Sequence, residues 1–89
     1  MPYIKEKDRR HIDSKLKDLV LVTAGELNYA FTKIILNYLD SVEKLNGGSV
    51  RYQDLNDVMG AIEGCKLELY RRKVADYEDK KADENGDVY

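Results

Sequence analysis

Two long stretches of the chain place apolar residues at the spacing of an α-helix. The first carries seven on one helical stripe: Leu27, Phe31, Ile34, Ile35, Tyr38, Val42 and Leu45. The second carries Leu55, Val58, Met59, Ile62, Cys65, Leu69 and Tyr70, and Tyr77 extends it. Apolar positions three or four residues apart lie on one face of a helix. The pattern therefore predicts two long helices, which the short loop at Asn46-Gly47-Gly48 would join as an antiparallel hairpin.

Local signals place the ends of these helices. Thr23 and Glu26 have the spacing of a capping box, and Val22 and Leu27 have the spacing of its hydrophobic staple, so the first long helix is expected to begin here. Asp54 is the predicted N-cap of the second. Two favourable i,i+4 ion pairs, Glu68–Arg72 and Asp76–Lys80, extend that helix to about residue 80.

A shorter helix is predicted ahead of the hairpin. Ile12, Leu16, Leu19 and Val20 share one stripe, and Asp13 is a plausible N-cap for a helix that reaches about Val22. The apolar run at 19–22 also fits a strand. The resulting fold class is all-α, one helical domain over residues 1–89, with short extended segments at the termini and near residues 49–52 as a variant.

The hairpin carries apolar residues that lie outside the main stripes. On the first long helix they are Tyr29, Leu36 and Leu39; on the second, Gly60, Gly64 and Leu67 form a further face. A chain of 89 residues has a small core, and oligomerisation is a common remedy when disulfides and metals are absent. These six positions are our candidate interface in a homo-oligomer, with a dimer favoured. Packing against the chain's own first helix is the alternative.

Charge is distributed unevenly. Residues 1–17 hold six Lys or Arg against three acids, and residues 76–89 hold six acids against two lysines. Arg9, Arg10, Arg71 and Arg72 lie in two basic clusters, at 5–17 and 70–73. Such clusters suit phosphate contacts, so a small nucleic-acid-binding regulator is the alternative function. The acidic pI of about 5.4 counts against it.

Catalytic chemistry has few candidates. His11 is expected to be a solvated surface residue and Cys65 a small buried hydrophobe. Asp57, Glu68 and Asp79 are predicted on the polar side of the second long helix, which leaves a metal-dependent nucleotide hydrolase as a further alternative only. We therefore expect no catalytic residues, no cofactor and no metal site, and favour a non-enzymatic interaction or regulatory protein. No apolar run is long enough for a membrane span and no signal peptide is evident, so a cytoplasmic location is expected.

The final stretch, Asp83 to Tyr89, invites comparison with a calcium loop. Aligned on an EF-hand, Lys81 would occupy the first ligand position, so the comparison fails. Asn85-Gly86 predicts either a type I′ turn or a glycine stop to the helix. Either would return Val88 and Tyr89 against the protein as an ordered tail.

Three segments carry a family resemblance: YIKEKDRR at 3–10, LNYAFTK at 27–33, and YRRKVADYEDKKADENGDVY at 70–89. Together they resemble a family of short uncharacterised prokaryotic and phage proteins, over essentially the whole chain. The resemblance implies a free-standing protein and carries over no catalytic or binding residue.

Overall fold

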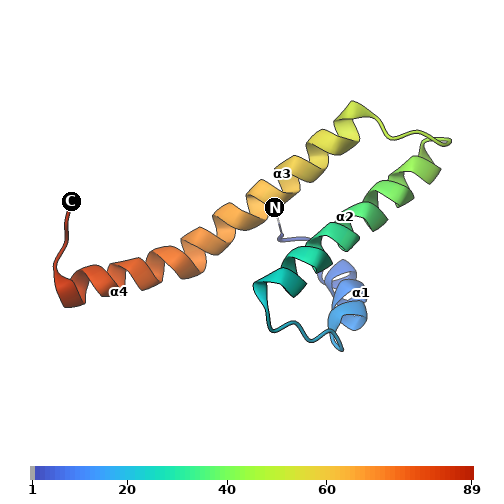
Figure 1. The fold of residues 1–89 in the computed structure, drawn as a ribbon. Coiled ribbons are helices and arrows are strands. Elements are labelled where there is room, and N and C mark those ends of the chain that lie inside the picture. Colours follow the sequence, from blue (N-terminus) through green and yellow to red (C-terminus); the bar gives the residue numbers. More distant parts are fainter. Residues whose placement is uncertain (1) are drawn as a thin grey trace. The chain divides into compact units, whose positions relative to one another are not determined.

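The protein is all-α, as predicted. The computed structural model describes residues 2–89, and these residues contain no β-strand. The helical elements are α1 (Glu6–Leu16), α2 (Ala24–Leu45), α3 (Tyr52–Leu69), the π-helical η1 (Tyr70–Val74) and α4 (Ala75–Asn85) (Figure 1). The extended variant near residues 49–52 and the strand at 19–22 are therefore not formed.

Two compact units divide the described chain. We name them the N-terminal unit, residues 3–58, and the C-terminal unit, residues 59–89, which also takes in Pro2. The N-terminal unit holds α1, α2 and the first turns of α3. The C-terminal unit holds the rest of α3, η1, α4 and the last four residues. A single domain over residues 1–89 stays a prediction.

The first helix lies earlier in the chain than predicted. It begins at Glu6 rather than at Asp13, and it ends at Leu16 rather than near Val22. Acids in its first turn suit the helix dipole, and Glu6 pairs with Arg10 at 3.8 Å. Residues 19–22 are not helical, because β-branched valines alternate there and lose side-chain freedom in a helix.

The start of α2 confirms the predicted capping box. The Glu26 N–H donates to Thr23 Oγ1 at 3.0 Å, and Glu26 Oε1 accepts from the N–H groups of Thr23 at 3.1 Å and Val22 at 3.2 Å. The bond from the Val22 N–H, followed by that from the Thr23 side chain, lowers the pKa of Glu26. Val22 stays 82% exposed, so the predicted staple buries little surface.

The predicted glycine stop of α2 is also present. Gly47 and Gly48 both have positive φ, at 75° and 106°, a region that glycine enters without steric cost. The Gly48 N–H donates to the carbonyl of Glu43 at 2.9 Å. This bond satisfies one of the free carbonyls at the helix end.

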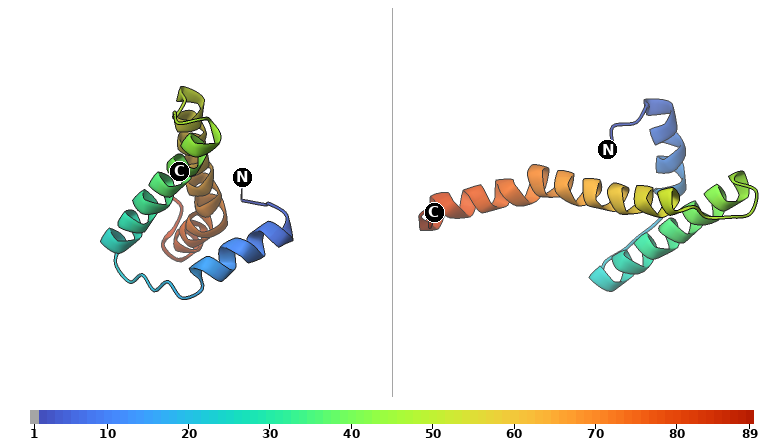
Figure 2. Two further views of the ribbon diagram at one scale, coloured as in Figure 1. Left: turned by 90° about the vertical axis from the view of Figure 1, so that its right-hand side faces the viewer. Right: turned by 90° about the horizontal axis from the view of Figure 1, so that it is seen from above.

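The second long helix has no non-helical break, but its middle turn is π-helical and not α-helical. Elements α3, η1 and α4 follow one another directly from Tyr52 to Asn85, as the right-hand view of Figure 2 shows. In η1 the N–H of Ala75 donates to the carbonyl of Tyr70, five residues back. Asp76 pairs with Lys80 at 3.2 Å as predicted. Glu68 pairs with Arg71 instead of Arg72, since i+3 and i+4 neighbours are both within reach on a helix.

Gly86 ends the helix, and the tail that follows stays uncovered. Its φ is 90°, and its N–H donates to the carbonyl of Ala82 at 2.8 Å. Asn85 belongs to α4, and no residue other than glycine has positive φ in residues 2–89, so the type I′ turn is not formed. Val88 is 91% exposed and Tyr89 is fully exposed, so the prediction that they pack against the protein was wrong.

Candidate interaction surface

The apolar side chains of α2 are exposed on two opposite faces. On the main stripe Phe31 and Ile34 are about half exposed, and on the second face Tyr29 is 66% exposed and Leu36 53%. No hydrophobic side chain among residues 2–89 is buried. Large exposed apolar surfaces are uncommon on folded monomers, so α2 is the candidate surface for an interaction.

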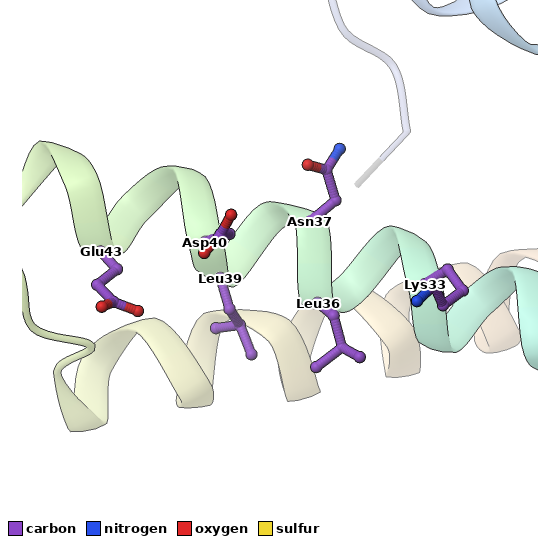
Figure 3. Close-up of a pocket in the computed structure, with 6 residues that line it drawn as sticks. All are labelled: Lys33, Leu36, Asn37, Leu39, Asp40 and Glu43. Atoms are coloured by element: carbon purple, nitrogen blue, oxygen red, sulfur yellow. The ribbon is translucent and has the colours of Figure 1, made fainter.

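Two of the predicted interface residues share one side of α2. Leu36 and Leu39 project together from the helix, whereas Asn37 projects from the other side (Figure 3). Together with Lys33, Asn37, Asp40 and Glu43 they line a shallow hollow of about 480 Å³. Leu39 is half-buried. This side of α2 is thus an apolar patch bordered by charged residues, an arrangement common at protein interfaces.

A second hollow lies in the N-terminal unit between the end of α1 and the start of α2. We call it the α1–α2 groove. Its volume is about 610 Å³, and it is lined by Leu16, Leu19, Leu21, Gly25, Glu26, Tyr29, Ala30, Lys33 and Ile34. Tyr29 was predicted as an interface residue, but Leu19 and Leu21 were not. Leu19 and Leu21 lie two residues apart in a continuous apolar run, so they share one face if that run is extended, and the strand alternative for residues 19–22 could have identified that face.

The loop before α3 is organised by Asp54, the one buried residue in the described chain, at 3% exposure. Helix α3 starts at Tyr52, so Asp54 lies in its first turn and is not the N-cap that the sequence predicted. Its Oδ2 accepts from the Arg51 N–H at 2.9 Å and from Asn46 Nδ2 at 3.0 Å. Its Oδ1 pairs with Arg51 Nη2 at 3.2 Å.

These bonds favour the ionised form of Asp54. The side-chain bond from Arg51, followed by that from the Arg51 N–H, lowers the pKa of the Asp54 carboxyl, and Asn46 adds to the effect. The same pairing raises the pKa of Arg51. All the partners of this carboxylate come from the chain itself, so it is a structural group that holds the loop rather than a free acid.

The predicted interface positions on the second long helix are Gly60, Gly64 and Leu67, which we call the glycine face. A Cβ placed on Gly60 would have no atom within 4 Å, so no other segment of the C-terminal unit approaches it. Gly64 is half-buried, and Leu67 is 58% exposed. No contact within the C-terminal unit therefore accounts for a glycine at position 60.

Three of the four candidate arginines already have partners. Arg9 Nε donates to the carbonyl of Ile4 at 2.7 Å, Arg10 pairs with Glu6, and Arg71 pairs with Glu68. Arg72 lies exposed in η1. The sequence did not predict that the 70–73 cluster would be π-helical.

The residues considered for catalysis are dispersed. His11 is exposed as predicted, but Cys65 is also exposed, so the prediction of a buried Cys65 was wrong. Asp57 accepts a hydrogen bond from Gln53 Nε2 at 2.7 Å. Within residues 2–89 no three His, Cys, Asp or Glu side chains gather where they could hold a metal ion.

Tyr70 contacts an acid two turns along the helix. A hydrogen bond to Glu78 and the charge of that carboxylate raise the pKa of the Tyr70 hydroxyl. Both residues lie in the C-terminal unit, on either side of the η1–α4 junction.

The described part of the chain contains no helix with the length and apolar character needed to span a membrane.

Comparison with known proteins gives a family but no characterised relative. No curated protein and no solved structure matches the chain. A family described as "Domain of unknown function (DUF6899)" matches residues 1–88. That match covers nearly the whole sequence, and the chain therefore belongs to the DUF6899 family.

Proposed function

We propose that this chain is a non-enzymatic helical interaction or regulatory protein that acts as a homo-oligomer, with a dimer as the working assembly. The observation that carries the proposal is the exposure of its apolar residues. Not one hydrophobic side chain is buried among residues 2–89, although the chain is 43% hydrophobic. A folded domain depends on such burial for its stability, so a partner surface has to supply it.

Helix α2 offers the main surface for that contact. Its 22 residues make a rod about 33 Å long, and Tyr29, Leu36 and Leu39 add a second apolar face to its main stripe. Two copies of such a helix can pack against each other through interlocking side chains. Charged residues at the edges would then stay in water.

Sedimentation velocity across a micromolar concentration range tests the proposal. The wild-type chain is expected to sediment as a dimer, and the double variant Leu36→Asp with Leu39→Asp as a monomer, because two carboxylates would be buried at the interface. Asn37→Asp is the matched control, since it adds a charge to the polar border of the same hollow while its side chain projects away from the two leucines (Figure 3). A wild-type monomer that unfolds cooperatively would refute the proposal.

Nucleic-acid binding is the alternative function and has less support. Arg9, Arg10 and Arg71 bond to groups within the chain, whereas Arg72 and Lys73 of the 70–73 cluster form no salt bridge to another described residue. Binding of labelled duplex DNA that is lost at moderate salt, and lost in Arg72→Ala, would favour this alternative.

A metal-dependent hydrolase gains no support from the arrangement of the carboxylates. A cytoplasmic location is part of the first proposal, consistent with a single unpaired Cys65.

A further inference from the structure

The hollow around Leu36 and Leu39 carries charges of opposite sign at its two ends. Lys33 lies at the end nearer the start of α2, and Glu43 lies at the end nearer its C-terminus, with the two leucines between them (Figure 3). All the residues that line this hollow belong to α2. No residue of α1 or of the first turns of α3, the other helices of the N-terminal unit, lines it. The N-terminal unit therefore leaves this side of α2 open.

The charged groups at the border of the hollow have few partners. Lys33 and Glu43 form no salt bridge to another described residue. Lys33 Nζ lies 5.9 Å from the centroid of the Tyr29 ring. Asp40 pairs with Lys44 at 3.7 Å, and both side chains of that pair are exposed. Exposed contacts of this kind are weak, so the charges of a partner can replace them.

The spacing of these charges makes the surface complementary to itself in one direction. The helical rise places Lys33 about 10 Å from Asp40 and about 15 Å from Glu43 along the axis. If two copies of α2 lie antiparallel with their leucines at a two-fold axis, the lysine of each copy lies beside the two acids of the other. A parallel pair would place lysine beside lysine and acid beside acid. Like charges across an interface oppose that arrangement.

The apolar centre and the charged border have different roles in such a contact. Leu36 is 53% exposed and Leu39 is half-buried, so contact with the leucines of a second copy removes apolar surface from water. The charges contribute little to affinity by comparison, but they select the partner surface and its direction.

We propose that α2 pairs with α2 of a second copy in an antiparallel two-fold contact centred on Leu36 and Leu39. In this contact Lys33 of each copy faces Asp40 and Glu43 of the other. The inference rests on the proposed homo-oligomer and gives the residues and the direction of its contact. Each interaction occurs twice in a two-fold dimer, so a single substitution changes both ends.

Charge reversal tests the pairing, with the dissociation constant of the full chain measured by sedimentation equilibrium. Lys33→Glu should weaken dimerisation about tenfold, because it places like charges at both ends of the contact. Asp40→Lys with Glu43→Lys should weaken it to a similar extent, and the chain with all these changes should regain the wild-type affinity. Lys7→Glu is the matched control, since it makes the same change of net charge in the first turn of α1, where an acid suits the helix dipole.

The outcomes separate this contact from the proposed function. A dimer whose affinity is unchanged by Lys33→Glu refutes the antiparallel contact alone, because in a parallel pair position 33 faces a like charge before and after the change. Failure of the combined variant to regain affinity refutes it too, since reversal of every charge restores the complementarity. A wild-type monomer refutes the proposed function as well.

A distance measurement tests the direction without changing these charges. A nitroxide is attached to Asn28→Cys in the full chain, with the exposed Cys65 replaced by serine. In the antiparallel dimer residue 28 lies about 14 Å along the helix from the two-fold axis, so the two labels should be roughly 30 Å apart by double electron–electron resonance. A separation close to the interaxial spacing of about 10 Å would mean parallel helices. That result, or a separation far above the expected one, overturns the inference.

Discussion

The loop before α3 and the faces of α2 differ sharply in how well the chain covers them. The loop is held by the one buried residue of the described chain, Asp54 in the first turn of α3, whose carboxylate bonds to Arg51 and Asn46. Helix α2 is rich in apolar residues and buries none of them. The contrast shows that short-range polar contacts set the ends of the helices, while the apolar side chains, whose burial supplies most of the stability of a folded protein, stay exposed in residues 2–89.

The largest expected effect concerns the exposed apolar residues of α2. If a second copy covers α2, the melting temperature should rise with protein concentration, because mass action favours the assembled state. Circular dichroism melts over a hundredfold range of concentration measure this dependence. Leu36→Asp with Leu39→Asp should abolish it, and Asn37→Asp should preserve it. A melting temperature independent of concentration in the wild type would show that each chain is stable alone.

The next effect concerns the loop. Asp54→Ala removes the acceptor for the Arg51 N–H and for Asn46 Nδ2, so both donors lose their partner. We expect the melting temperature to fall on the order of 5 °C. Asp57→Ala is the control, since Asp57 is exposed and its hydrogen bond is to the side chain of Gln53. Equal effects of the two changes would show that burial of Asp54 is unimportant.

Acid should weaken the same polar contacts. The pKa values of Asp54 and Glu26 are lowered in the folded state from ordinary values of 3.8 and 4.5. Their contribution is complete above those ordinary values and is lost as the pH falls below them toward the lowered folded values. Urea unfolding between pH 3 and pH 6, about the ordinary carboxyl pKa range, should show stability falling at the acid end. Asp54→Asn with Glu26→Gln should flatten that decline.

The capping box at the start of α2 is a smaller polar contribution. Thr23→Ala leaves the Glu26 N–H without its acceptor and should cost about 1 kcal/mol of unfolding free energy. Thr32 is the matched control, because its hydroxyl donates to the Asn28 carbonyl inside the helix, where the backbone is already bonded. Chemical denaturation of Thr23→Ala and Thr32→Ala should separate them by most of that amount.

The smallest expected effect concerns Gly60, one of the predicted interface residues. Gly60→Ala meets open space in the described chain, and replacing a glycine inside a helix by alanine stabilises it by up to about 1 kcal/mol. A gain in stability with unchanged dimer affinity would place position 60 outside the interface. Weaker dimerisation would show that a helix of the second copy approaches the backbone at position 60, and that the glycine face is part of the interface.

Much of the fold could be predicted because its signals are short-range. The capping box spans four residues, and the glycine stops at 47, 48 and 86 need only the local backbone. The two faces of α2 follow from helical spacing alone. These features depend on groups within one or two turns of one another, which is the range over which a sequence pattern is informative.

Other features were missed because they depend on competing contacts. The charged start of α1 is stabilised by ion pairs and the dipole despite its lack of apolar residues, so a search for apolar stripes placed the helix too late. Asp54 could act as an N-cap or reach back to Arg51, and the bond to Asn46, eight residues away, lies outside any local motif. The α1–α2 groove is lined by helical and non-helical segments. The spacing of apolar residues within each segment does not show that the segments lie close together.

The sequence by itself determined that the chain is helical, where α2 begins and ends, and that α2 carries apolar residues on two faces. Only the tertiary structure decided which of those residues are covered, and in residues 2–89 that choice fell on a carboxylate and not on a hydrophobic side chain. The reason is physical. Helix ends are governed by backbone groups a few residues apart, whereas burial of apolar area depends on which surfaces come together.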